Sequence, residues 1–228
     1  MPRQGAINLL GSGLSATDQY TDALRVKKAE LAMMERVGAP EANILPVLTN
    51  LANSYTSLGR LEQALFLYRD VYSRRLKLNG EEHERTLLAA NNYASSLADH
   101  KHFRAARSLF RKILPVAPRV LGESNDLTLR MRRIYAETLY EDGDATLDDL
   151  REAVKTLEEL APTARRVLGS THPDVAGIER GLRMSRAELG SREMTAAGRG
   201  TTRADDVRSL CEAVAAMAST QGSGDARS

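Results

Sequence analysis

The spacing of apolar residues along the chain predicts helices almost throughout. In the segment 48–55, four residues follow the i, i+3, i+4, i+7 spacing that places side chains on one face of a helix. These are Leu48, Leu51, Ala52 and Tyr55, and the matching quartets later in the chain are Ala90, Tyr93, Ala94, Leu97 and Arg132, Tyr135, Ala136, Leu139. A second helical segment follows each quartet. The chain is therefore predicted to be a series of two-helix units.

A small residue recurs at the same position of each predicted helix. Ala52, Ala94 and Ala136 align in the first helices, and Ala64, Ala106 and Ala153 align in the second helices. Small residues at a helix crossing allow the two axes to approach to the short end of the ~8–10 Å range. The large residues Tyr68, Phe110 and Leu157 are expected to fill the space beside the crossings. Because neither helix can bury its apolar face alone, we expect an all-α, right-handed α-solenoid of stacked antiparallel helix pairs.

A short phrase that joins the units also repeats. "RVLGESNDLT" at 119–128 returns as "RVLGSTHPDV" at 166–175, and a looser form, "KLNGEEHERT", occupies 77–86. The glycines Gly80, Gly122 and Gly169 are 42 and 47 residues apart and should end helices, because glycine readily adopts a positive φ at a helix C-terminus. Three residues later, His83, Asn125 and His172 stand where the next helix should begin. The phrase is interpreted as a connector between helices.

These connectors predict the boundaries of the repeats. The array should cover 7–190, with a degenerate unit at 7–38, three units at 39–80, 81–122 and 123–169, and a partial unit at 170–190. A linker is predicted at 191–203, a capping helix at 204–219 and a disordered tail at 220–228. Pro115 and Pro162 should each kink or end a second helix.

Composition narrows the class of protein further. The chain is 42% hydrophobic but only 4% aromatic, and its formal charge is +2 with acids and bases intermixed. A nucleic-acid or membrane surface would require a concentrated basic stripe, so neither partner is expected. The single cysteine, Cys211, excludes an internal disulfide and fits a reducing compartment. The start of the chain is interpreted as a degenerate helix rather than a signal peptide, so we expect a cytoplasmic protein.

Candidate chemistry is sparse. The sequence contains no HExxH motif, no Cys/His cluster and no glycine-rich phosphate loop, so no catalytic residue, metal site or cofactor is predicted. The insert "EDGDATLDD" at 141–149 lacks the glycine and terminal glutamate of an EF-hand loop. We interpret it as a solvated loop in which Thr146 and Asp149 form a capping box.

The two-helix unit, its small and large positions and its "LG…HPD" connector resemble the tetratricopeptide repeat, in the long-helix variety of kinesin light chains. This resemblance implies a non-enzymatic adaptor or scaffold that binds a partner peptide, with acidic residues in the ligand as one possibility. The sequence departs from those light chains in having no sustained heptad run for a coiled coil. Two alternatives remain open, a sensor array of a larger signalling protein and a self-associating scaffold; the oligomeric state is not predicted.

Stacked helix pairs form a curved groove lined by their first helices. The residues that lie off the buried face and should line this groove are Thr49, Asn50, Asn53, Asn91, Asn92, Ser95, Arg130, Arg133, Glu137 and Tyr140. Asparagine amides can donate to and accept from an extended peptide, but they can equally brace a neighbouring helix. Arg130 and Arg133 could bind ligand carboxylates, or could simply form a solvated surface.

Overall fold

The computed structural model describes residues 21–22 and 24–221, with side chains described as far as residue 197. Residues 21–22 and 24–36 are helical, and the helices that follow are α2 (Glu41–Ser57), α3 (Leu61–Asn79), α4 (Glu84–Asp99), α5 (Phe103–Ile113), α6 (Ala117–Leu121), α7 (Asp126–Tyr140), α8 (Leu147–Leu168) and α9 (Pro173–Gln221). No strand occurs in the described residues. The predicted all-α fold class is confirmed.

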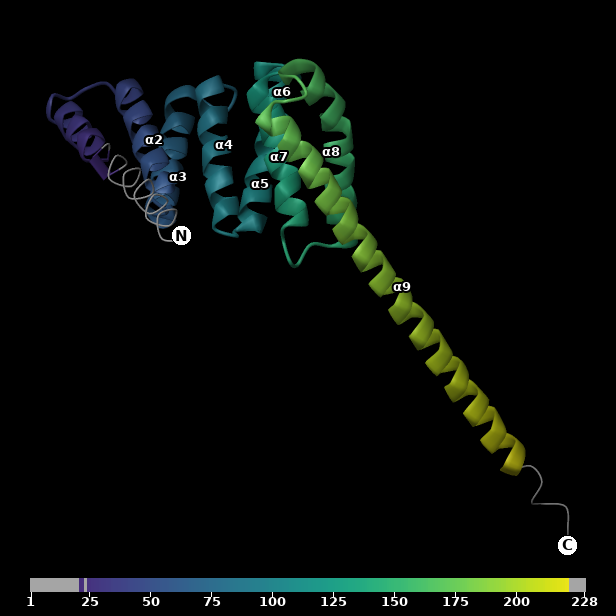
Figure 1. The fold of residues 1–228 in the computed structure, drawn as a ribbon. Coiled ribbons are helices and arrows are strands. Elements are labelled where there is room, and N and C mark those ends of the chain that lie inside the picture. Colours follow the sequence, from purple (N-terminus) through teal and green to yellow (C-terminus); the bar gives the residue numbers. More distant parts are fainter. Residues whose placement is uncertain (1–20, 23, 222–228) are drawn as a thin grey trace, which may run out of the picture.

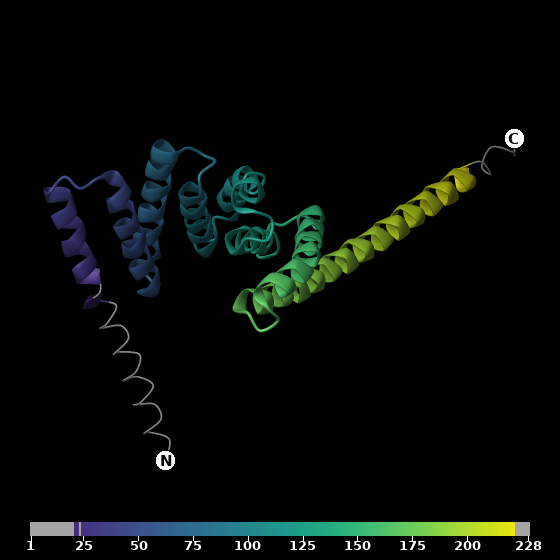
Figure 2. The same ribbon diagram turned by 90° about the horizontal axis from the view of Figure 1, so that it is seen from above.

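The helices stack in chain order as antiparallel pairs, as Figures 1 and 2 show. The pair α2–α3 lies within predicted unit 39–80, the helices α4, α5 and α6 lie within 81–122, and the pair α7–α8 lies within 123–169. Successive pairs pack through the contacts of α3 with α4, α5 with α7, and α8 with α9. Of the predicted degenerate unit, residues 7–20 lie outside the described residues.

The small residues that align in the sequence lie at the centre of the packing. All six aligned alanines, Ala52, Ala64, Ala94, Ala106, Ala136 and Ala153, are completely buried. The large residues beside them are also buried, and Phe110 and Leu157 expose none of their surface. A buried Cβ with no room around it is the expected signature of closely approaching helix axes. The complete burial of these alanines agrees with the helix crossings predicted from the sequence.

The connectors have the predicted geometry, with one refinement. Gly80, Gly122 and Gly169 end α3, α6 and α8 with φ of 80°, 101° and 87°. Their ψ values of 178°, 150° and 152° place them in an extended region that is essentially restricted to glycine, rather than in the left-handed helical region. His83 and Asn125 then accept a hydrogen bond from the backbone N–H two residues on, as N-caps do.

The two prolines expected to disturb second helices behave differently. In the second unit the helix is interrupted after Ile113, and it resumes at Ala117 with Pro118 in its first turn. In the third unit α8 continues through Pro162 to Leu168, so of the two expected outcomes, a kink or an end, the end does not occur there. The second unit has a second proline, Pro118, three residues after Pro115, so two backbone N–H donors are missing within one turn, whereas α8 lacks only one.

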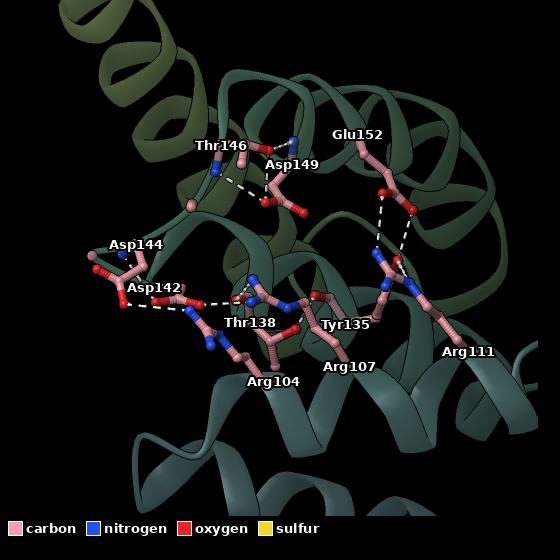
Figure 3. Close-up of polar contacts among 12 residues, drawn as sticks. Arg104, Arg107, Arg111, Tyr135, Thr138, Asp142, Asp144, Thr146, Asp149 and Glu152 are labelled. Carbon is pink, nitrogen blue, oxygen red and sulfur yellow. Dashed lines mark hydrogen bonds and ion pairs between the residues drawn. The ribbon is translucent and has the colours of Figure 1, made fainter.

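The insert of the third unit is fastened to α5 and to the start of α8 (Figure 3). The Arg107 guanidinium donates to the Asp142 carboxylate at 2.6 Å, and both side chains are about nine-tenths buried. Thr146 and Asp149 form the predicted capping box, with Asp149 N–H donating to Thr146 Oγ1 at 3.1 Å. The insert is therefore a braced turn that joins the second and third units.

At the C-terminal end the structure differs from the sequence prediction. The segment 191–203, expected to be a linker, is helical, and α9 runs without interruption to Gln221, past the segment 204–219 expected to be a separate helix. The glycines at 198 and 200 each weaken a helix by about 1 kcal/mol, but no proline follows Pro173, so no residue forces a break. Residues 222–228 of the predicted tail lie outside the described residues.

The helix α9 leaves the array after packing on α7 and α8 and extends away from it (Figure 1). Its first turns approach closely, since a Cβ added at Gly181 would lie 3.2 Å from Tyr140 Oη. Farther along, Arg192 donates to the carbonyl oxygens of Gly143 and Ala145 in the insert. Within residues 21–22 and 24–221, no helix combines the length and apolar character needed to cross a membrane.

Candidate functional site

The first helices of successive units surround a cavity of about 660 Å³, here called the central cavity. It is lined by Thr56 of α2, by Ser95, Ala98 and Asp99 of α4, by Ile134, Arg133, Glu137 and Thr138 of α7, by Arg180 of α9, and by Leu61, Lys101 and Glu141 at its margin. A cavity touched by α2, α4, α7 and α9 requires these four helices to curve around it. The central cavity thus marks the concave face of the solenoid.

A second hollow of about 410 Å³, here called the lateral cavity, lies between α2, α3 and α4. Its lining residues are Ala42, Asn43, Pro46, Thr49 and Asn50 of α2, Val71 and Arg75 of α3, and Arg85, Leu88, Ala89 and Asn92 of α4. On α4 the two cavities share one stripe, because Arg85, Leu88, Asn92, Ser95 and Asp99 follow the three- and four-residue spacing of a helix face. The two cavities therefore lie along the same face of α4.

The central cavity is charged but balanced. Its lining contains three carboxylates, Asp99, Glu137 and Glu141, and three cations, Lys101, Arg133 and Arg180. Burial raises the pKa of Glu137, and the neighbouring Arg133 opposes this rise. Burial likewise raises the pKa of Asp99. A surface of this kind offers donors and acceptors to a ligand without a strong overall preference for one sign of charge.

The two arginines that the sequence suggested for ligand carboxylates already have carboxylate partners within the chain. Arg133 donates to Glu137 at 2.5 Å, and its Nε lies 3.3 Å from Asp174 Oδ1. Arg130 donates to Asp126 at 3.0 Å and lies 3.7 Å from Asp174. Asp174 belongs to α9. The packing of α9 on α7 therefore places this carboxylate, which is distant in sequence, next to both arginines.

The predicted groove residues divide by position. Ser95, Arg133 and Glu137 line the central cavity, and Thr49, Asn50 and Asn92 line the lateral cavity. Asn53 is exposed on α2, and its Oδ1 accepts a 2.6 Å hydrogen bond from the Tyr68 hydroxyl, which is the bracing role considered from sequence.

Two predicted groove residues are not on the exposed surface. Asn91 is 3% exposed, because it follows Leu87 by four residues and precedes Ala94 by three, both of which are in the core. Tyr140 is 9% exposed and packs against Gly181 of α9. Burial raises the pKa of the Tyr140 hydroxyl to about 12. These two residues are corrected from groove positions to packing positions.

Sequence reasoning missed six charged residues of the groove: Arg75, Arg85, Asp99, Lys101, Glu141 and Arg180. Arg85 could have been found, since it lies seven residues before Asn92 on the same face of one helix. Arg75 belongs to a second helix, and no local signal indicates that it reaches the groove.

The residues considered for metal binding or redox chemistry form no further candidate site in the described part of the chain. Among the residues that the structure describes, no group of three or more His, Cys, Asp or Glu side chains could hold a metal ion. The Asp142 carboxylate in the insert binds Arg107, and Asp149 caps α8. The side chain of Cys211 lies outside the described residues.

Comparison with known proteins agrees with the repeat architecture. The family model of the tetratricopeptide repeat matches residues 44–119, which span α2 to α6. No curated protein matches the chain. Solved structures similar in fold include a Podosopora anserina protein titled as a kinesin light chain with nearly identical TPR-like repeats, at 18% identity and a TM-score of 0.65, covering 91% of this chain and 96% of that one.

A second solved structure is similar to the same degree. BtubC (BKLC) from P. vanneervenii has 17% identity and a TM-score of 0.65, with 85% of this chain and 75% of that chain covered. At these identities the likeness concerns the fold. The stack of α2 to α9 is therefore similar in fold to these two solved structures.

Proposed function

We propose that the chain, whose residues 44–119 match the tetratricopeptide repeat and whose fold is similar to that of kinesin-light-chain-like structures, is a non-enzymatic protein-interaction module. Its ligand is an extended segment of a partner protein, bound along the groove formed by α2, α4, α7 and α9. In this role the chain serves as an adaptor or scaffold. Its single cysteine agrees with a place in the cytoplasm.

One observation carries the proposal: four successive first helices line the same central cavity. A ligand lying there contacts three repeats and α9 at once, so its affinity arises from many weak contacts on a preformed surface. The polar groups along the cavity suit a peptide backbone, whose N–H and C=O groups each need a partner when they leave water. The balanced charges of the lining help to orient a segment of mixed sequence.

The proposal is tested by selecting 12-residue peptides from a random displayed library on the whole chain and measuring their affinity by fluorescence anisotropy. The test variant is Ser95→Trp, which places a large ring in the central cavity. The control is Ser108→Trp, an exposed position on α5 outside the groove. Both variants should retain the circular dichroism spectrum of the wild type.

We expect Ser95→Trp to weaken selected peptides by about tenfold or more, equivalent to about 1.4 kcal/mol, while Ser108→Trp leaves affinity within about twofold. Peptides that bind both variants equally well would move the interaction surface away from the concave face. Failure to select any binding peptide would also count against the proposal.

A further inference from the structure

The lateral cavity differs from the central cavity in the sign of its charge. It is lined by the guanidinium groups of Arg75 and Arg85 and contains no carboxylate. The rest of its polar lining consists of the Asn43, Asn50 and Asn92 amides and a threonine hydroxyl. The guanidinium groups and the amides can donate hydrogen bonds, whereas the threonine hydroxyl already donates to the Leu45 carbonyl, so the hollow presents positive charge and N–H donors together.

Arg75 is the most unusual residue of this hollow. Its residue surface is only 5% exposed, and its Nη1 is buried without a hydrogen-bond partner among the described residues. Burial lowers the pKa of Arg75, and the nearby Arg85 lowers it further. A buried cation without an ionic partner is costly, and an arginine retains its charge under these conditions.

Other shielded arginines of the solenoid are neutralised by the chain itself. Arg107 pairs with Asp142, and Arg133 pairs with Glu137 and Asp174. Glu41, the acid that acts electrostatically on Arg75, is held by Arg74, which donates to both of its carboxylate oxygens at 2.5 and 2.8 Å. Arg75 and Arg85 form no ion pair within the described part of the chain.

We propose that the lateral cavity binds an oxyanion carried by the partner segment, either a carboxylate or a phosphate group on one of its side chains. Arg75 and Arg85 supply the positive charge, and the three asparagine amides donate to the remaining oxygens. Guanidinium groups match the paired oxygens of both anions. The inference rests on the proposed function, since the segment that fills the central cavity brings the anion into the adjoining hollow.

The test uses the whole chain and small anions, so it does not depend on a known peptide. Arginine side-chain ¹⁵N–¹H resonances are followed during separate titrations with sodium phosphate and sodium acetate, with sodium chloride at equal ionic strength as reference. Arg85→Ala is the main variant, because Arg85 is exposed and its loss leaves the core intact. Arg166→Ala, at an exposed arginine of α8 outside both cavities, is the matched control.

We expect a saturable shift of the Arg75 resonance that chloride does not reproduce, and a loss of affinity of about tenfold in Arg85→Ala but less than about twofold in Arg166→Ala. Stronger binding of phosphate identifies a phosphorylated side chain as the ligand, and stronger binding of acetate identifies an acidic one. Shifts that never saturate, or equal affinity in Arg85→Ala and wild type, would overturn the inference.

Failure of the anion site and failure of the proposed peptide-binding function would give different experimental results. If selected peptides bind in the central cavity with the same affinity in Arg85→Ala, the oxyanion site is wrong and the protein-binding function stands. If no peptide binds but phosphate or acetate binds saturably at Arg75, the anion site stands and the proposed peptide-binding function is wrong.

Discussion

The ion pair between Arg107 of α5 and Asp142 of the insert provides the sharpest stability prediction. It joins the second and third units through a 2.6 Å contact, and Arg107 Nη1 also donates to the Thr138 carbonyl at 3.3 Å (Figure 3). The side chains are only 10% and 11% exposed. Replacing Arg107 with alanine leaves the Asp142 carboxylate buried without its cation.

The cost follows from that burial. Removing one partner of a buried ion pair typically costs about 3–5 kcal/mol, and the residual exposure here points to the lower end, about 3 kcal/mol. The contact between Arg119 and Glu82 is a matched comparison, since its length of 2.7 Å is similar but its side chains are 66% and 65% exposed. Arg119→Ala should therefore cost at most about 1 kcal/mol, because water screens an exposed pair.

The assay is chemical and thermal unfolding of wild type, Arg107→Ala, Asp142→Ala, the double variant and Arg119→Ala, followed by circular dichroism. For a domain of this size, about 3 kcal/mol lowers the melting temperature by roughly 6–12 °C. The double variant should lose less unfolding free energy than the sum of the losses in the two single variants, because each single variant leaves the other charge buried without its partner. If Arg107→Ala destabilises the protein no more than Arg119→Ala, burial does not control the strength of this contact and the reasoning is refuted.

Two further predictions concern the core and a titrating pair. Ala94→Leu should overpack a helix crossing and lower the unfolding free energy by about 1–3 kcal/mol, whereas Ala98→Leu, half-buried on the same helix, should cost clearly less; equal melting temperatures would refute the crossing. The hydrogen bonds from Arg74 hold the pKa of Glu41 below its usual range, so the stability that Glu41 contributes is present above its unfolded pKa and is lost as pH falls through the lower folded pKa. The difference in stability between wild type and Glu41→Gln, measured by denaturant titration at neutral and at acidic pH, should therefore shrink in acid, and a gap independent of pH would exclude this linkage.

The repeating core was predictable because its determinants are local. The alanines at 52, 94 and 136 repeat at an interval of 42 residues, and side chains spaced by three and four residues must share a helix face. N-caps and capping boxes are equally local, since donor and acceptor lie two or three residues apart, which is why His83, Asn125 and Thr146 could be identified from sequence alone.

The candidate site was only partly predictable, because its electrostatics depend on residues that folding brings together. Asp174 neutralises Arg133 from 41 positions away, so the arginine that seemed suited to bind a ligand is occupied by the chain itself. Arg75 shows the opposite case, since only the stacking of α2, α3 and α4 buries it and leaves it without an acid. Helix periodicity specifies which residues share a face, and the sequence alone therefore determined the faces of the helices. The pairing of charges across helices depends on distances in three dimensions, so only the tertiary structure decided which charges are neutralised.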